Sequence, residues 1–379
     1  MGSGLGRTLP GAYYRDPDVF RMEFERIFAK TWYCLGRSEA VEQHRSYLAA
    51  DVIDQPIVVL RDDAGVLRAF HNVCRHRGAL LCDPGRGKLK SAITCPYHGW
   101  AYRLDGRLAG TPNIARHEIP REEFGLHSIR VDEWQGCLFV NLSGDAPPLE
   151  TWLELQSDQP RQFERWNLGD LRVAHTTSSD VAANWKILIE NYGECLHCPG
   201  VHPELVNLVP TYRKGAVSDP ARIDGGVGLR AGAHAMTIDG ESRLPTLPAL
   251  TAEEGSSYYG AHIFPNATVD FGGTFATLQR IVPRAADRST RVIEYLFAPD
   301  TIAESGFDPT GVIEFNELVV GQDHSICERV QLGLASHAFG RGVYAEKDQG
   351  PLRFDEVYAD FFGAGGEPAG GGGAVTGVC

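Results

Sequence analysis

The chain has 379 residues, of which 43% are hydrophobic and 22% are charged, and its formal net charge is -13. This length is sufficient for two domains that each bury a core, and the composition is that of ordinary globular proteins. No uninterrupted apolar run is long enough to cross a bilayer, and an acidic chain lacks the basic face that phosphate binding requires, so we expect neither a membrane protein nor a nucleic-acid-binding protein.

The first half of the chain predicts a helical segment followed by a β-rich domain. Asp16 and Pro17 are typical of a helix start, and apolar residues follow them at helical spacing. Short runs with strand character come next, and the prolines at 147–148 indicate a linker. We therefore expect an N-terminal helical segment over residues 1–40 and a β-rich domain over residues 41–150.

Helical spacing returns after the linker and alternates with strand-like segments. The expected elements are a helix, two β segments and a long helix, at residues 185–192, 261–284, 290–297 and 311–334. These elements predict a second domain over residues 151–362. The tail over residues 363–379 is so rich in glycine that we expect it to be disordered.

Nine cysteines raise the question of disulfides or metal ligation. The N-terminus lacks the basic flank and apolar stretch of a secretory signal, so we expect a cytoplasmic protein, in which disulfides are rare. Metal ligation therefore explains clustered cysteines better than a disulfide framework. Cys34, Cys82 and Cys137 have no histidine at ligand spacing and are expected in the core, and Cys379 in the glycine-rich tail is not expected to be a ligand.

Two separate segments each carry one cysteine and one histidine. Cys74 and His76 stand in the first segment, and Cys95 and His98 in the second, with a glycine one or two residues after each histidine. A 2Fe-2S cluster with two cysteines on one iron and two histidines on the other requires this ligand set. A structural zinc site is the alternative, but zinc modules usually pair cysteine with cysteine and histidine with histidine.

A second group of possible ligands begins at the end of the helix predicted at 185–192. His197 and His202 stand five residues apart, and a Pro-Gly pair between them would break the helix and carry His202 back toward His197. One metal bound from a helix end and the following loop keeps positions open for oxygen and substrate. The alternatives are two ordinary, partly buried histidines, or a redox or zinc pair formed by Cys195 and Cys198, which are also compatible with simple packing beside the metal.

A ferrous site also needs a carboxylate, and the late helix offers one. An apolar stripe at helical spacing is formed there by Phe315, Val319, Ile326 and Val330. Asp323 lies on this stripe, where a bare carboxylate would be costly unless it met a metal or a cation. Asp323 is therefore the third expected ligand, and an ion pair with Arg329 is the alternative.

With both groups in view, the chain up to about residue 362 resembles the catalytic α subunits of Rieske non-haem iron oxygenases. Its two loops read Cys-x-His-Arg-Gly and Cys-x2-His-Gly-Trp, as in Rieske proteins. The resemblance implies an α+β fold, with an N-terminal β-rich Rieske 2Fe-2S domain and a C-terminal catalytic domain in which an antiparallel sheet grips a long helix. It also implies that the helical segment 1–40 packs on the catalytic domain and that the protein is a homotrimer.

The resemblance also suggests how the two centres communicate. In this family an acid three residues before the first iron histidine connects the cluster histidine of one subunit to the iron of its neighbour, and Glu194 holds that position here. Glu190 lies four residues earlier and is a competitor for the same roles. A Glu at this position is typical of the branch with carnitine monooxygenase and the glycine betaine and stachydrine demethylases, which the runs 190–203 and 327–331 resemble most.

The implied function is that of an oxygenase that uses O2, a 2Fe-2S cluster and a mononuclear Fe(II). NAD(P)H would act indirectly, through a separate flavin/iron-sulfur reductase, because no Gly-rich dinucleotide fingerprint follows a strand. Our first choice of reaction is oxidative N-demethylation or monooxygenation of a betaine-like quaternary ammonium compound. Hydroxylation of a neutral aromatic or polycyclic substrate and simple electron transfer are the alternatives. Aromatic faces that could hold a cation are offered by Tyr258, Tyr259, Phe264, Phe271 and Phe275.

Overall fold

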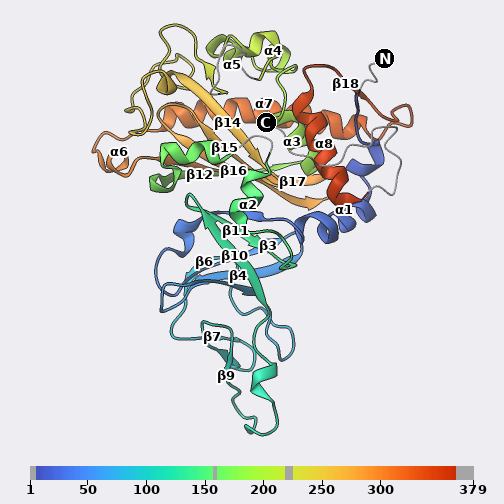
Figure 1. The fold of residues 1–379 in the computed structure, drawn as a ribbon, viewed down its shortest axis with the longest axis vertical. Helices are drawn as coiled ribbons and strands as arrows, with labels where there is room; N and C mark the ends of the chain where they lie inside the picture. Colours follow the sequence, from blue (N-terminus) through green and yellow to red (C-terminus); the bar gives the residue numbers. More distant parts are fainter. Residues whose placement is uncertain (1–5, 157–159, 218–224, 364–379) are drawn as a thin grey trace.

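The computed structural model describes residues 6–156, 160–217 and 225–363. In Figure 1 a β-rich half lies below a mixed half, and the longest axis of the molecule runs through both. The described part of the chain contains no helix with the length and apolarity that a membrane span requires. The glycine-rich tail predicted from residue 363, with Cys379, lies outside the described residues apart from Gly363.

The N-terminal segment begins with the predicted helix. Helix α1 (Pro17–Glu23) is capped by Asp16, whose side chain accepts a hydrogen bond from the backbone N–H of Asp18, and it continues as a π-helical turn over Phe24–Phe28. Proline at the first position and an aspartate cap are favoured at helix starts.

The lower half is built on a seven-stranded antiparallel sheet with the order β2-β11-β10-β5-β4-β3-β6. Its strands are β2 (Tyr33–Arg37), β3 (Ser46–Val52), β4 (Gln55–Arg61), β5 (Leu67–His71), β6 (Gly85–Lys88), β10 (Ser128–Trp134) and β11 (Cys137–Asn141). Strand β2 pairs with β11, so this sheet takes in residues 33–37, which the sequence analysis assigned to the N-terminal segment.

A small three-stranded sheet forms the far end of this half. It contains β7 (Ile93–Thr94), β8 (Ala101–Tyr102) and β9 (Leu108–Gly110), and β7 and β9 mark the lower tip of the molecule in Figure 1. The two predicted cysteine-histidine loops lie next to these strands and to β5, so they belong to this end of the molecule.

The upper half is built on a six-stranded antiparallel sheet with the order β12-β17-β16-β15-β14-β13. Its strands are β12 (Arg172–Val181), β13 (Val227–Gly228), β14 (Ser257–Ile263), β15 (Ala267–Phe271), β16 (Ala276–Ala285) and β17 (Arg288–Phe297). The segment 261–284, expected as one β region, is thus divided among β14, β15 and β16, because short turns reverse the chain twice within it.

The remaining elements are mostly helices around the upper sheet. They are α2 (Leu149–Glu154), α3 (Trp185–Tyr192), α4 (Cys198–Val201), α5 (Pro203–Leu208), α6 (Pro299–Ala303), α7 (Thr310–Gly333) and α8 (Gln349–Phe362), with the short strands β1 (Gly6–Arg7) and β18 (Val343–Tyr344) paired to each other. The long helix α7 lies across one face of the sheet (Figure 1), where Val312 and Phe315 pack against Ile293 and Tyr295 of β17.

The opposite face of the upper sheet packs on the lower half. Asn266, between β14 and β15, accepts a hydrogen bond from the backbone N–H of Cys34 and donates one to its carbonyl, at 3.0 and 3.1 Å. These bonds fix the upper sheet to strand β2 and so join the two halves through one core.

The apolar stripe predicted on the long helix is only partly correct. The residues that α7 buries are Val312, Phe315, Val320, Cys327 and Gln331. Val330, by contrast, is 44% exposed. The helix contacts α3 as well as the sheet, so its buried face is set by two surfaces and departs from one regular stripe.

A buried ion pair ties the N-terminal segment to the upper half. Lys186 of α3 and Glu23 of α1 are both fully buried and form an ion pair. The indole N–H of Trp185 and the hydroxyl of Tyr358 in α8 also donate to the Glu23 carboxylate, each at 2.9 Å. Three segments that are distant in the sequence therefore meet at one carboxylate.

We predict that Lys186→Met destabilises the protein by about 3–5 kcal/mol, because it leaves the Glu23 carboxylate buried without a cation. Thermal and urea unfolding of the purified protein measure this loss. The double variant Lys186→Met/Glu23→Gln removes both charges and is expected to recover much of the stability. Equal losses in the single and double variants would show that the uncompensated charge is not the cause.

Candidate functional site

The two cysteine-histidine loops have the same backbone turn. The N–H of Gly78 donates to the carbonyl of Cys74 at 3.0 Å, and the N–H of Gly99 donates to the carbonyl of Cys95 at 3.1 Å. Both glycines have positive φ angles, 76° and 72°, a conformation that side chains disfavour. Each loop therefore folds back on itself and presents its cysteine and histidine together.

The structure brings the four predicted cluster residues into one group. The thiols of Cys74 and Cys95 are each 2% exposed, and the ring centroids of His76 and His98 are 4.7 Å apart. Burial raises the pKa of Cys74, and the neighbouring Cys95 thiol raises it further. The Nδ1 atom of His76 is buried and has no hydrogen-bond partner among the described residues. Two adjacent thiols and an unpaired imidazole nitrogen fit a 2Fe-2S cluster.

Two aromatic residues support this group: Trp100, which ends the second motif, and Tyr102, which the sequence did not indicate. The ring of His76 stacks on Trp100, with centroids 4.7 Å apart and planes 5° apart. The hydroxyl of Tyr102 lies 3.3 Å from the Sγ atom of Cys74 and accepts the backbone N–H of Arg75. Tyr97, beside His98, is 59% exposed, so the edge of the group lies at the surface.

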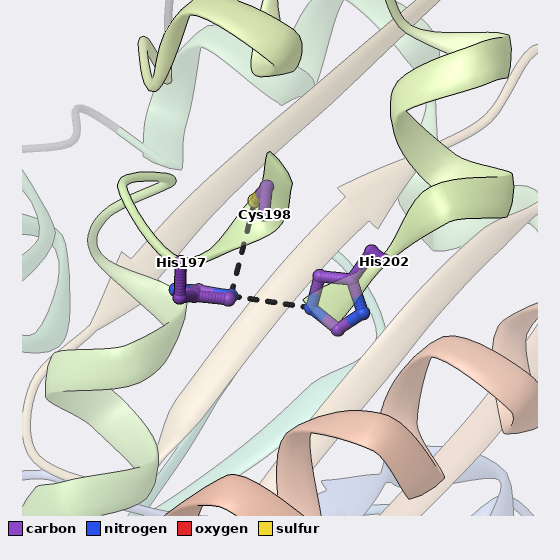
Figure 2. A group of neighbouring side chains, drawn as sticks. All are labelled: His197, Cys198 and His202. Carbon is purple, nitrogen blue, oxygen red and sulfur yellow. Dashed lines mark hydrogen bonds between the residues drawn. The ribbon is translucent and has the colours of Figure 1, made fainter. Parts of the chain in front are cut away.

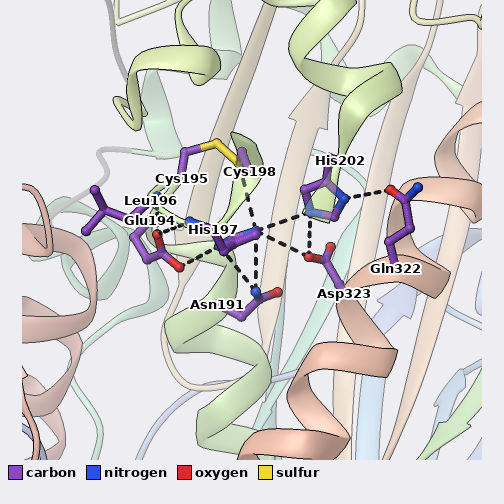
Figure 3. The surroundings of a disulfide bond; sticks show 9 residues. All are labelled: Asn191, Glu194, Cys195, Leu196, His197, Cys198, His202, Gln322 and Asp323. Atoms are coloured by element: carbon purple, nitrogen blue, oxygen red, sulfur yellow. Dashed lines mark hydrogen bonds and ion pairs between the residues drawn. A yellow bond between two sulfur atoms is a disulfide. The ribbon is translucent and has the colours of Figure 1, made fainter. Parts of the chain in front are cut away.

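The second group joins three side chains from different elements. The Nε2 atoms of His197 and His202 are 3.2 Å apart, and the Oδ1 atom of Asp323 lies 3.4 and 2.9 Å from them (Figures 2 and 3). Two ligands of one metal with bonds of about 2.1 Å lie roughly 3.0–3.4 Å apart. The two imidazoles and the carboxylate are therefore spaced as ligands of a single ion.

The local fold explains how His202 returns to His197. Helix α3 ends before His197, and the single turn of α4 begins at Cys198 with Pro199 in its first positions. The backbone N–H of His202 then donates to the carbonyl of Cys198 at 2.9 Å. The break predicted from the Pro-Gly pair is the turn that brings the two imidazoles together.

The charges of this group favour a bound cation. Burial acts to raise the pKa of Asp323, but hydrogen bonds with His197 and His202 and the charge of Arg291 lower it below its usual range. Burial acts to lower the pKa of His197, yet the Asp323 and Glu194 carboxylates raise it to about 9. Arg329 was the alternative partner expected for Asp323, but no ion pair between them is found among the described residues. The nearby positive charge is that of Arg291 on β17, which lowers the pKa of Asp323.

The two candidate acids on and after α3 have different surroundings. The Oε1 atom of Glu194 lies 2.5 Å from Nδ1 of His197, and Oε2 accepts the backbone N–H groups of Leu196 and His197 (Figure 3). Glu190 accepts a hydrogen bond from the hydroxyl of Tyr14 at 2.8 Å and forms a side-chain hydrogen bond with Asp355 of α8. The structure therefore places Glu194 against the histidine group and Glu190 in a separate network.

Two amide side chains beside the histidines were not predicted as site residues. Gln322 places Oε1 2.7 Å from Nδ1 of His202 and donates to Glu204 at 3.0 Å, while Nδ2 of Asn191 lies 3.4 Å from Nε2 of His197 (Figure 3). Partners of this kind orient a ligand imidazole and fix its tautomer. Gln322 could have been considered from the sequence because it directly precedes Asp323.

Cys195 and Cys198 form a disulfide in the structure (Figure 3), which agrees with the redox pair named as an alternative and contradicts the expectation that metal ligation explains clustered cysteines better than disulfides. The turn after α3 brings their Cα atoms to 4.9 Å, within the range of disulfides. Cys34, Cys82 and Cys137 are buried free thiols, as predicted.

The five aromatic candidates lie on two faces of the upper sheet, because side chains alternate along a strand. Tyr258 and Phe275 belong to the cluster that contains Cys195, Cys198 and the inner face of α7. Tyr259, Phe264 and Phe271 belong to the core on the opposite face, where Trp166 packs against Tyr259 and Phe271. Of the five, only Tyr258 and Phe275 therefore lie on the face of the sheet that carries the histidine group.

Comparisons with known proteins agree with this architecture. Residues 31–130 match the Rieske [2Fe-2S] domain, and residues 168–364 match the ring hydroxylating alpha subunit (catalytic domain). The chain is 30% identical to the glycine betaine monooxygenase oxygenase subunit of Chromohalobacter salexigens, over 93% of this chain and 85% of that protein. It is 31% identical to the carnitine monooxygenase oxygenase subunit of Acinetobacter baumannii, over 88% of this chain and 87% of that protein.

Solved structures give the same result. The quaternary ammonium Rieske monooxygenase CntA in complex with L-carnitine superposes with a TM-score of 0.76 at 26% identity, over 95% of this chain and 96% of that one. Naphthalene 1,2-dioxygenase from Rhodococcus, 19% identical with a TM-score of 0.73, shares the fold.

The chain belongs to the Rieske non-haem iron oxygenases, as a catalytic α subunit. The predicted family, fold class, enzyme class and cofactors, a 2Fe-2S cluster and a mononuclear iron, are confirmed. Its matched relatives are oxygenase subunits, so a separate reductase supplies the electrons. The alternative of a simple electron carrier is wrong, because a complete catalytic domain follows the Rieske domain.

We predict that the buried pair Glu190 and Asp355 contributes stability that is lost as the pH rises above about 4, and that Glu190→Gln reduces this contribution. Burial and the neighbouring Asp355 charge raise the pKa of Glu190, and burial raises the pKa of Asp355 to about 6. A raised folded-state pKa gives stability that is present below the unfolded value and is lost as the pH rises through the folded value. Melting temperatures measured from pH 4.5 to 9 test this.

The matched control is Glu356→Gln, which removes a carboxylate of α8 whose side chain is 55% exposed. This control is expected to follow the wild-type profile. A Glu190→Gln profile as steep as that of the wild type would contradict the role given to the buried acid pair.

Proposed function

We propose that this chain is the oxygenase component of a two-component system that oxidises a quaternary ammonium compound. The carbon next to the ammonium nitrogen is hydroxylated, and when that carbon is an N-methyl group the product breaks down to a tertiary amine and formaldehyde. The names of the relatives support this substrate class. The observation in this chain that carries it is a buried carboxylate surrounded by tyrosines on the catalytic face of the sheet.

The Asp270 cluster consists of Asp270, Tyr192, Tyr212 and Tyr258. The hydroxyls of Tyr192 and Tyr258 donate to Oδ1 of Asp270 at 2.6 and 2.7 Å. Its Oδ2 atom accepts from Gln279 and Thr277, at 2.8 and 3.0 Å. Tyr212 and Tyr258 pack in the same apolar cluster as the disulfide beside the histidine group.

This cluster combines aromatic faces with negative charge. Burial and then the charge of Asp270 raise the pKa of Tyr258 and of Tyr212, and the charge of Asp323 also raises the pKa of Tyr258. Tyr258 therefore lies in the electrostatic field of both carboxylates. A quaternary ammonium donates no hydrogen bond, so aromatic faces and a nearby negative charge are the features that bind it.

We assign the two metal centres to the two groups of side chains described above. Cys74, His76, Cys95 and His98 hold the 2Fe-2S cluster, and the mononuclear iron is held by His197, His202 and Asp323. When bound, the cluster supplies electrons and the iron supplies the activation of O2. Glu194 orients the His197 imidazole through Nδ1 and offers a hydrogen-bonded route to it.

We infer a homotrimer in which electrons pass between chains. Within one chain the cluster loops lie at the lower tip of the molecule, next to β7 and β9, while α4 and α5 beside the histidine group lie at the top (Figure 1). A head-to-tail ring brings the tip of one chain to the histidine group of the next, and a closed ring is the usual outcome of such contacts. The electron donor is an NAD(P)H-dependent flavin/iron-sulfur reductase, which favours the cytoplasm as its location.

We predict that His197→Ala or Asp323→Ala removes the mononuclear iron and abolishes turnover while the cluster remains. Anaerobically reconstituted wild type should contain about three irons and two acid-labile sulfides per chain, and each variant about two irons and two sulfides. Metal and sulfide analysis, together with the visible spectrum of the cluster, measure this. Full iron and activity in Asp323→Ala would mean that another acid completes the site.

Glu194→Gln serves as the matched control for metal loss. It removes the charge beside His197 but leaves all seven proposed ligands, so both metals are expected to stay. Reoxidation of the reduced cluster in the presence of O2 and substrate should slow, as stopped-flow absorbance shows. Loss of iron in this variant would make Glu194 a structural residue of the iron site.

We predict that the reductase-coupled enzyme releases formaldehyde from at least one of glycine betaine, carnitine or choline, with matched consumption of NAD(P)H. Replacing the ammonium nitrogen of that substrate by carbon should weaken binding, because each cation-aromatic contact contributes about 0.5–2 kcal/mol. Asp270→Asn and Tyr258→Phe should raise KM more than they lower kcat.

Aromatic acids and Phe264→Leu are the controls for this assay, since Phe264 packs on the face away from the histidine group. The variant should bind substrate as the wild type does. Hydroxylation of an aromatic acid, with no formaldehyde from any methylammonium compound, would overturn the substrate class and leave the metal assignment intact.

A further inference from the structure

The cysteine pair in the loop after α3 lies inside the proposed iron site. Its spacing, Cys195-Leu196-His197-Cys198, is a C-x-x-C sequence with a ligand histidine between the two cysteines. Cysteines in such motifs are frequently redox-active. Among the described residues this is the one disulfide, and its sulfurs belong to side chains that are 4% and 2% exposed.

The sulfur of Cys198 is placed as a fourth ligand would be. Its Sγ atom lies 3.8 Å from Nε2 of His197, and the ligand atoms of His197, Cys198 and His202 all lie within 4.8 Å of one another (Figure 2). In a tetrahedral site with Zn–S and Zn–N bonds of about 2.3 and 2.0 Å, sulfur and nitrogen are roughly 3.5 Å apart. In the structure this sulfur is bonded to Cys195 and therefore has no thiolate to offer a metal.

We propose that the Cys195–Cys198 couple selects the metal of the mononuclear site, an inference that rests on the proposed ligands His197, His202 and Asp323. With the disulfide closed, the donors are two imidazoles and one carboxylate, a set that leaves positions open and suits Fe(II). With the disulfide open, Cys198 adds a thiolate and completes a four-donor set that suits Zn²⁺. The closed disulfide therefore lowers the preference of this site for zinc over iron.

The switch is a balanced thiol-disulfide exchange. A dithiol reductant gives two electrons and two protons to the Cys195–Cys198 bond and is itself oxidised to a disulfide, leaving two thiols on the loop. Zinc then binds the Cys198 sulfur as its thiol proton leaves. An oxidised dithiol reverses the exchange. Leu196, between the cysteines, is 42% exposed, so the loop borders solvent.

Two serine variants distinguish metal selection by Cys198 from a disulfide that only stabilises the loop, because both variants lose the disulfide. Cys195→Ser leaves the Cys198 thiol beside His197 permanently, whereas Cys198→Ser removes the only sulfur in that position. A staple that merely stiffens the loop predicts the same behaviour for both variants. Metal selection by Cys198 predicts opposite behaviour.

The experiment uses the full-length protein with its cluster in place and the mononuclear metal removed by a chelator. Alkylation and mass spectrometry first establish the state of the Cys195–Cys198 peptide, before and after treatment with a dithiol that is then removed anaerobically. Equimolar Zn²⁺ and Fe²⁺ are added, and the bound metals are counted. X-ray absorption at the zinc edge detects any Zn–S bond, at about 2.3 Å.

The zinc-to-iron ratio at the mononuclear site should rise about tenfold or more on reduction of the wild type, since even outer-sphere partners of a metal ligand alter affinity by roughly 10- to 100-fold. Cys195→Ser should show the high ratio and the Zn–S bond without reductant. Cys198→Ser should keep the low ratio and show only nitrogen and oxygen ligands in both states.

Two results would overturn this proposal. The same ratio in oxidised and reduced wild type, with no Zn–S bond, would mean that Cys198 never reaches the metal. Identical ratios in the two serine variants would reduce the disulfide to a staple. Failure of every form to bind either metal at His197, His202 and Asp323 would instead refute the iron site itself, and with it the proposed function.

Discussion

The carboxylate of Asp323, buried against two imidazoles, is the interaction on which the arrangement of the catalytic half depends. Burying this charge is costly, and the hydrogen bonds with His197 and His202 and the nearby Arg291 offset that cost. The offset requires α7 to lie on the sheet, so that Asp323 meets Arg291 of β17. It also requires the loop after α3 to turn back on itself. A folded scaffold and a preformed cation site are thus consequences of the same contacts.

Helix α3 connects this site to the rest of the molecule. Lys186 near its start joins the buried carboxylate of Glu23, and Glu190 near its end joins Tyr14 and the C-terminal helix. Glu194 and the histidine loop follow directly. Buried partners therefore hold α3 on several sides, and the side chains after it inherit a fixed position. This rigidity is what a site with precise ligand spacing requires.

The two metal-binding groups have different architectures for different tasks. The cluster group is made from two similar loops of a small β domain and leaves an imidazole edge near the surface beside Tyr97, which suits electron exchange with a partner. The group proposed to hold iron is made from a helix end, a single turn and a distant helix. Tyr212 and Tyr258 of the Asp270 cluster share an apolar cluster with the disulfide, so the sites proposed for substrate and for metal selection are neighbours.

The sequence by itself determined the parts whose chemistry is local. The ligands proposed for the cluster, Cys74, His76, Cys95 and His98, and the proposed iron pair His197 and His202 follow from residue types at short spacing, and their loops close through glycine and proline turns that short-range sterics dictate. The family followed from the same motifs. Asp323 could be predicted as a ligand because a carboxylate among apolar residues on a helix is energetically unusual. The apolar stripe predicted around it was nevertheless wrong at Val330, which is exposed.

Only the tertiary structure decided the contacts between distant segments. Spacing left Glu190 as a competitor of Glu194, and the tertiary structure gives them different partners: the N-terminus and α8 for Glu190, and the histidine loop for Glu194. The role of Arg291, the division of the aromatic residues between two faces of the sheet and the Asp270 cluster depend on strand register, which no local pattern specifies.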